Sequence, residues 1–226
     1  MTISKHPLAR SARDSVLALC AVLALAGLPC TARAEAPALQ ALPALDLAAY
    51  TGTWYQVAWF PNRFQRQCVS DTTATYRRRA DGAVDVLNRC RLADGSFDSA
   101  QGLARPAGAT LEGDQLRPAQ LEVSFLPAWL RWLPIWGDYW VIQRPEHGRY
   151  AVISEGSRQY LWVLSRTPVL PDDDLQVIRG QLVAQGFDLA AWQLHPHTQA
   201  AAAEPVEPAV AGQSRRPATP PAAQTR

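Results

Sequence analysis

The sequence YTGTWYQVAWF, Tyr50–Phe60, is rich in β-branched and aromatic residues, which favour an extended strand over a helix. A Gly before a Trp allows a close approach of two backbone segments, and an indole is large enough to close one end of a small barrel. We therefore expect Gly52 and Trp54 to lie at the closed end of a β-barrel, as structural residues.

A second strand-like segment, Tyr160–Arg166 (YLWVLSR), lies more than a hundred residues later and ends in an Arg at the edge of an apolar run. A guanidinium there can stack on an indole and donate hydrogen bonds to backbone carbonyls. We expect Arg166 to meet Trp54 at the closed end. Side chains alternate along a strand, so Tyr160 and Trp162 then point into the barrel with Leu164.

These two segments, together with Gly137–Trp140 (GDYW) between them, resemble the three conserved regions of the lipocalin family in order and spacing. The resemblance is greatest to bacterial outer-membrane lipocalins and their apolipoprotein D-like relatives, and it covers about Leu45 to Leu194. It implies an all-β fold, an eight-stranded antiparallel up-and-down barrel with one C-terminal α-helix packed outside. It also implies a protein that binds a fatty acid or lysophospholipid for transport, storage or cell-envelope maintenance, without a cofactor.

Turn signals divide the chain into short alternating runs, which is typical of such a barrel. A helix is expected to open at Asp172, because three Asp residues precede Leu175, Ile178, Leu182 and Val183 at helical spacing. The eight strands are expected at Gly52–Phe60, Ser70–Arg77, Val84–Arg91, Phe97–Ala104, Ala119–Phe125, Gly137–Arg144, Arg149–Glu155 and Gln159–Ser165.

The 226-residue chain has a formal net charge of only +2, which gives no reason to expect a nucleic-acid partner. Basic residues precede an apolar run, Val16–Leu28, and Ala32-Arg33-Ala34 forms an A-x-A cleavage pattern. We therefore expect a signal peptide over 1–34, an N-terminal arm over 35–47, a lipocalin domain over 48–196 and a disordered Ala/Pro-rich tail over 197–226.

Cleavage after Ala34 predicts export to the periplasm, with association with the outer membrane as an alternative. The relatives include lipid-anchored proteins, but Cys30 follows Pro29, which departs from the lipobox pattern. A released protein is therefore expected, and lipid anchoring is the alternative.

Two cysteines remain in the mature chain, Cys68 and Cys90, at similar distances on either side of the hairpin turn expected at Arg79–Gly82. Antiparallel pairing across that turn brings them together, and an oxidising compartment favours a bond between them. We predict a disulfide rather than a thiol nucleophile or a metal site.

The ligand is expected to contact a set of inward-facing residues. Tyr76 and Asn88 are chosen by similarity to pocket-lining positions of the family, whereas Phe125 and Trp140 are expected to add aromatic wall to the cup. The alternative is that any one of these residues fills the barrel as part of the core and does not contact the ligand. The full ligand-binding prediction comprises Tyr76, Asn88, Phe125, Trp140, Tyr160 and Trp162.

The segment Leu126–Trp136 contains three Trp and two Pro residues, so neither a continuous helix nor a central strand is expected. It is expected to pack over a barrel end or against a second subunit, which allows a homodimer. Contact with a membrane surface is the alternative.

No catalytic or metal-binding constellation is recognised. The pair His195 and His197 supplies only two ligands for a metal. We therefore expect a binding protein and not an enzyme. A lipocalin-fold enzyme acting on an apolar substrate is the alternative, and it would need a titratable group deep in the cup.

Overall fold

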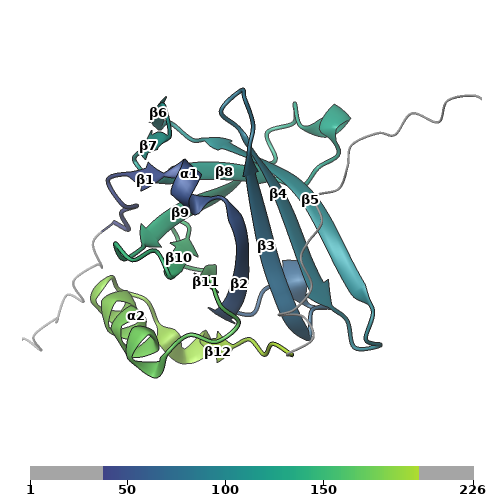
Figure 1. The fold of residues 1–226 in the computed structure, drawn as a ribbon, viewed down its shortest axis with the longest axis vertical. Coiled ribbons are helices and arrows are strands. Elements are labelled where there is room, and N and C mark those ends of the chain that lie inside the picture. The colour runs from purple at the N-terminus through teal and green to yellow at the C-terminus, as the bar shows by residue number, and fades with distance from the viewer. Residues whose placement is uncertain (1–37, 199–226) are drawn as a thin grey trace, which may run out of the picture. The chain divides into compact units, whose positions relative to one another are not determined.

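Eight antiparallel strands close into a barrel in the computed structural model, which describes residues 38–198 (Figure 1). Each strand pairs with the next along the ring, and the last strand pairs back with the first. The predicted fold is confirmed. The barrel strands are β2 (Gly52–Trp59), β3 (Ser70–Arg78), β4 (Val84–Arg91), β5 (Phe97–Pro106), β8 (Gln120–Ser124), β9 (Gly137–Gln143), β10 (Tyr150–Ser154) and β11 (Leu161–Ser165).

The turns between strands form where the sequence offers residues suited to them. Gly82 and Gly95 both have a positive φ, +83° and +86°, which a residue with a side chain rarely adopts. The hairpin between β3 and β4 and the hairpin between β4 and β5 therefore form at the two Asp-Gly pairs. These local signals explain why the observed strand bounds lie close to the predicted ones.

A small second sheet lies next to the closed end of the barrel. It contains β1 (Leu45–Asp46), β7 (Gln115–Arg117) and β6 (Thr110–Glu112), in that order. The one-turn helix α1 (Leu47–Tyr50) follows β1, and the Asp46 carboxylate accepts a hydrogen bond from the Ala49 backbone N–H. Buried leucines of β1 and β7 share one core cluster with Tyr50 and Trp54, so this sheet helps to close the barrel.

The helix α2 (Asp172–Ala184) packs outside the barrel (Figure 1), as predicted. Its Ile178 and Leu182 are fully buried in a cluster with outward-facing residues of β10 and β11. Val183, which we expected on the same face, is exposed. The three Asp residues occupy the first turn, where they complement the helix dipole, but the N-cap residue Pro171 provides no side-chain cap.

The segment after the helix completes the barrel wall. Strand β12 (Gln193–Leu194) pairs with the far end of β2, beyond the point where β2 stops pairing with β3. The next residues continue along this gap, because His195 N–H donates to Val57 O and Asp71 N–H donates to Pro196 O. Thr198 N–H donates to the Asp71 carboxylate and His197 binds Gln56 O, so the first two residues of the predicted tail, 197 and 198, contact the barrel wall.

Short 3-10 helices occur at Arg63–Gln65, Ala128–Leu130 and Leu189–Ala191. Within residues 38–198, no helix has the length and hydrophobicity needed to span a bilayer. The predicted signal peptide and the rest of the predicted tail, 199–226, lie outside the described residues.

Candidate functional site

Trp54 and Arg166 close the narrow end of the barrel. The Arg166 Cζ lies 3.6 Å from the centre of the Trp54 ring, and the indole is completely buried. Arg166 also donates hydrogen bonds to the carbonyl oxygens of Thr53, Thr51 and Ala49 at 2.9–3.0 Å. One guanidinium therefore joins β11, β2 and the segment around α1, and this matches the closure expected from the sequence.

Gly52 is required by its backbone conformation. Its φ is +91°, whereas a Cβ there would make only an ordinary contact of 3.5 Å with a guanidinium nitrogen of Arg166. A side chain would therefore be strained by the backbone conformation and not by crowding.

A cavity of about 760 Å³ occupies the barrel interior above this closure. That volume is within the range of sites for small organic ligands. Apolar groups form most of its wall, including Leu121, Val86, Ile153 and Leu164. The mouth lies at the ends of the strands where β2 leads into the loop that contains Phe64, and the Phe64 ring packs 5.7 Å from the Tyr160 ring.

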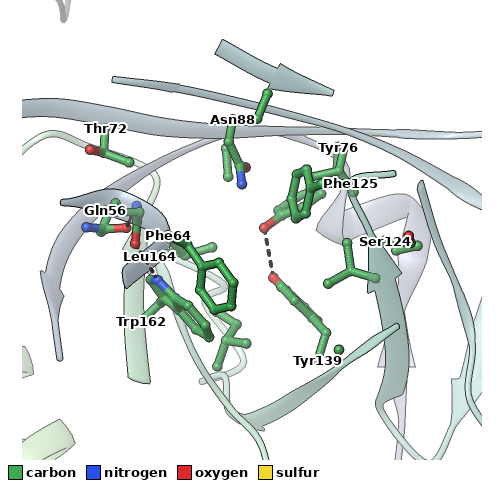
Figure 2. Close-up of a pocket in the computed structure, with 18 of the residues that line it drawn as sticks. Gln56, Phe64, Thr72, Tyr76, Asn88, Ser124, Phe125, Tyr139, Trp162 and Leu164 are labelled. Carbon is green, nitrogen blue, oxygen red and sulfur yellow. Dashed lines mark hydrogen bonds between the residues drawn. The ribbon is translucent and has the colours of Figure 1, made fainter. Parts of the chain in front are cut away.

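Five of the six predicted ligand-binding residues line this cavity. They are Tyr76, Asn88, Phe125, Tyr160 and Trp162 (Figure 2 labels four of them). Whether they contact a ligand stays a prediction.

The sixth predicted residue, Trp140, is placed differently. It does not line the cavity and packs instead among the residues of the cluster beneath α2, on the outer side of the barrel. The reason is the register of β9, in which Tyr139 pairs with the inward-facing Leu121. Alternation then turns Trp140 outward and Tyr139 inward. The alternation of Leu121 and Val123 in the sequence indicates which face of β8 points inward. The sequence does not indicate that Leu121 pairs with Tyr139, and this pairing decides which residue of β9 faces the cavity.

Three tyrosine hydroxyls meet inside the barrel. The Tyr139 hydroxyl lies 2.6 Å from that of Tyr50 and 2.9 Å from that of Tyr76 (Figure 2 draws the second contact). Burial raises the pKa of Tyr76 to about 12 and raises the pKa values of Tyr50 and Tyr139 well above their ordinary value. All three are therefore neutral phenols at physiological pH. We name Tyr50, Tyr76 and Tyr139 the tyrosine cluster. Tyr50 and Tyr139 were not predicted as site residues.

A second polar chain lies nearer the mouth. The Trp162 indole N–H donates to Gln65 Oε1 at 2.8 Å, and Gln65 Nε2 donates to Gln56 Oε1 at 2.9 Å. An indole N–H can only donate, so it fixes the orientation of both amides. Gln56 Nε2 is then left buried without a partner among residues 38–198. The chain ties the mouth loop to the barrel wall.

Charged side chains line the cavity only where the strands reach the mouth. They comprise the two arginines Arg63 and Arg89 and the three carboxylates Asp98, Asp138 and Glu155. Burial of Glu155 opposes its ionisation, but hydrogen bonds from Ser157 and from the backbone of Tyr160 and Gln159 lower its pKa overall. With both signs present, the mouth does not form a strong field for an anionic or a cationic ligand.

The Cys68–Cys90 disulfide is present, as predicted, with the two Cα atoms 5.4 Å apart. It joins the mouth loop to β4, and both cysteines line the upper cavity. These thiols are therefore bonded to each other.

The two histidines near the C-terminus of the described region sit in the barrel wall. His195 Nε2 shares a 2.8 Å hydrogen bond with the hydroxyl of Thr72, and His197 Nε2 donates to Gln56 O. Asp71 lies beside them, fully buried, and also binds Arg91. Within residues 38–198, no group of three or more His, Cys, Asp or Glu side chains is arranged to hold a metal ion.

The Trp-containing loop Leu126–Trp136 borders the mouth. Leu126, Ile135 and Trp136 line the cavity, and Arg105 lies 3.9 Å from the Trp136 ring centre. Trp129 and Trp132 are not packed over the barrel end. They are 73% and 77% exposed in the single chain. This corrects the expectation of intramolecular packing for these two indoles.

Comparison with known proteins identifies the family. Residues 45–197 match the family model described as a lipocalin-like domain. Temperature-induced lipocalin-1 of Arabidopsis thaliana is 34% identical over 73% of this chain and 85% of its own length. The outer membrane lipoprotein Blc of Escherichia coli is 36% identical over 64% of this chain and 75% of its own, and apolipoprotein D of Mus musculus is 26% identical over 73% and 87%.

A solved structure supports the same fold. Insecticyanin from the tobacco hornworm Manduca sexta aligns with a TM-score of 0.57 at 17% identity, over 74% of this chain and 89% of its own. The chain belongs to the lipocalin family, whose members bind small hydrophobic ligands, and the resemblance recognised in the sequence is confirmed.

Proposed function

We propose that this lipocalin is an exported protein that binds a hydrophobic ligand in the barrel cavity, for lipid transport, storage or maintenance of the cell envelope. The observation that carries the proposal is the mostly apolar cavity of about 760 Å³, which is closed at one end by Trp54 and Arg166 and open at the mouth. Burial of apolar surface supplies about 25 cal/mol per Å², so a chain-like lipid gains affinity along the whole wall. The E. coli relative named an outer membrane lipoprotein supports a location in the envelope.

Fatty acids and lysophospholipids are the ligand class proposed, with the head group near the mouth. The apolar wall suits an acyl chain, and the charged residues are confined to the mouth, where a polar head can stay hydrated. Binding would be reversible and non-covalent.

The test is native mass spectrometry of the mature protein purified from its own periplasm, followed by identification of any organic extract. A co-purified lipid at close to one per chain is the expected result. An empty protein that also fails to bind fatty acids or lysolipids on titration would refute the carrier proposal.

A matched pair of variants tests whether the ligand binds inside the barrel. Asn88 lines the cavity, whereas its neighbour on β4, Leu87, does not. Asn88→Trp should fill part of the cavity and weaken lipid binding, whereas Leu87→Trp should leave it unchanged. Equal binding by both variants would place the ligand elsewhere.

The exposure of Trp129 and Trp132 favours a second function, contact with a membrane surface at the cavity mouth. Indoles partition well into the interfacial region of a bilayer. The test is co-sedimentation with vesicles of phosphatidylethanolamine and phosphatidylglycerol. The Trp129→Ser/Trp132→Ser variant should lose binding, whereas Val169→Ser/Val183→Ser, changed at two exposed residues outside this loop, should keep it.

A second copy of the chain is the competing partner for these indoles. Sedimentation velocity would then detect a dimer that the Trp129→Ser/Trp132→Ser variant dissociates. Negligible vesicle binding by the wild-type protein and by both double variants would remove the membrane proposal.

A further inference from the structure

We propose that the tyrosine cluster and Asn88 form a polar subsite deep in the barrel, which binds a neutral oxygen acceptor on the buried end of the ligand. The inference rests on the proposed function, because it concerns a ligand in the same cavity. It specifies a ligand that is oxygenated at its deep end, such as a long-chain compound with a carbonyl far from its head group.

The hydrogen count of the tyrosine cluster supplies the first argument. Three hydroxyls carry three hydrogens, but only two hydrogen bonds join them, from Tyr139 to Tyr50 and to Tyr76. In every arrangement of donors and acceptors, one O–H is left without an acceptor. Once a ligand displaces water from this hydroxyl, an O–H left unpaired costs about 1–3 kcal/mol, so a ligand with an acceptor at this point is favoured.

Asn88 supplies the second argument, from another strand. Its carboxamide lines the cavity and makes no hydrogen bond to the described protein residues. In Figure 2 the Asn88 amide points toward the same space as the Tyr76 and Tyr139 hydroxyls. The amide offers two donor hydrogens, which with the unused O–H makes three donor hydrogens that no described residue accepts.

The charges argue for a neutral acceptor. The charged residues of the lining belong to the mouth, and Arg166 lies below the Trp54 ring with its guanidinium donating to backbone carbonyls. A carboxylate at the cluster would lose its hydration, which is unfavourable in a buried site. Arg166 favours negative charge at Tyr50 and Tyr76, but burial outweighs it, because the pKa values of both phenols are raised. A ketone, aldehyde or ester oxygen needs only the hydrogen bonds that the subsite offers.

A saturated chain end is poorly suited to this subsite. Its terminal methyl group would displace water from the tyrosine hydroxyls and from Asn88 without replacing the hydrogen bonds. In an ordinary apolar pocket an added carbonyl weakens binding, because the polar group loses water. A gain in affinity on adding the carbonyl is therefore diagnostic of the subsite.

The experiment compares fatty acids with matched acids that carry a ketone next to the terminal methyl group, from ten to sixteen carbons. Hexadecanoate and 15-oxohexadecanoate are the longest pair, with the same charge and chain length. Dissociation constants are measured at pH 7.5 by displacement of a fluorescent fatty acid. At the length that reaches the subsite, we expect the oxo acid to bind about ten-fold more tightly, as one hydrogen bond to a buried donor predicts.

Two variants should remove this preference. Tyr50→Phe/Tyr76→Phe/Tyr139→Phe deletes all three hydroxyls and preserves the rings, and such a paired removal is nearly neutral for folding. Asn88→Leu removes an amide that has no hydrogen-bond partner in the described part of the chain, so it provides a second variant if the triple variant does not fold. Tyr150→Phe is the matched control, because Tyr150 is a buried tyrosine outside the cavity lining.

The outcomes separate this inference from the proposed function. If the oxo acids bind no more tightly than the parent acids at every length, or if their advantage persists in both subsite variants, the subsite is refuted while the lipid-binding proposal stands. If neither series binds to the wild-type protein, the lipid-binding proposal itself fails.

Discussion

Arg166 stacks on Trp54 at 3.6 Å and donates to three backbone carbonyls, so a single side chain holds the last barrel strand, the first strand and the α1 segment together. The contact is partly shielded from water, which strengthens both the cation–π attraction and the charged hydrogen bonds. The two residues are separated by more than a hundred positions in the sequence. Their contact therefore constrains the closure of the whole barrel.

The first prediction concerns this closure. Arg166→Ala should lower the free energy of unfolding by about 2–4 kcal/mol, because it removes the stack and three hydrogen bonds to backbone carbonyls. Arg166→Lys should recover only part of the loss, since an ammonium cannot span the carbonyls while lying flat on the indole. Urea unfolding followed by Trp fluorescence measures both effects.

A matched control is Arg77→Ala, which removes an exposed ion pair to Asp85. It should change the unfolding free energy by less than about 1 kcal/mol. Equal effects of Arg77→Ala and Arg166→Ala would contradict a special role for the closure.

The sequence predicts the individual strands and turns because their signals are local. The alternation of side chains along β2 and β11 depends only on neighbouring residues, and so do the Asp-Gly turns at Gly82 and Gly95. The structure contains these strands and turns where the sequence predicts them. The family resemblance then orders the strands in the barrel.

The orientation of Trp140 depends on a longer-range relationship. Whether Tyr139 or Trp140 faces inward is decided by the pairing of β9 with β8, and a shift of one residue exchanges the two faces. The tyrosine cluster was missed for the same reason. It joins α1, β3 and β9, three elements whose contact no local pattern reports.

The second prediction concerns the disulfide. The cysteines are 22 residues apart, and a cross-link over such a loop contributes about 3 kcal/mol by restricting the unfolded chain. Cys68→Ala/Cys90→Ala should lose stability by about that amount in urea. Dithiothreitol should destabilise the wild-type protein and leave the double variant unaffected. A response of the double variant to the reductant would show that another effect is involved.

The third prediction concerns the mouth loop. Trp162→Phe removes the indole N–H that donates to Gln65, and it also releases the orientation of Gln65 and Gln56. We expect a loss of about 1 kcal/mol in stability and faster amide hydrogen exchange in residues 61–67. Trp192→Phe, at a residue that does not line the cavity, is the control. Unchanged exchange in the loop of Trp162→Phe would argue against the hydrogen-bond chain as its anchor.

The last prediction concerns acid, and it arises from the histidines that complete the barrel wall. Burial, followed by the proximity of His197, lowers the pKa of His195 to about 4, and burial also lowers the pKa of His197. The unfolded state therefore binds more protons than the folded state below the ordinary histidine pKa. Stability that is fully present above about pH 6.5 should be lost as the pH falls toward 4, by up to about 1.4 kcal/mol per pH unit for each histidine.

Asp71 partly opposes this effect for both histidines, because its carboxylate favours their protonated forms. Burial opposes ionisation of Asp71, but hydrogen bonds from Arg91, Thr198 and Ser70 lower its pKa overall, so the stability it contributes is lost only at more acidic pH, below its ordinary value. Urea unfolding at pH 7.5, 6.5, 5.5 and 4.5 covers the histidine window and stays above the window in which Asp71 is protonated. His195→Gln/His197→Gln should be less stable than the wild type at pH 7.5 and should vary less between pH 6.5 and 4.5. An equally steep loss in that variant would show that other groups cause the acid sensitivity.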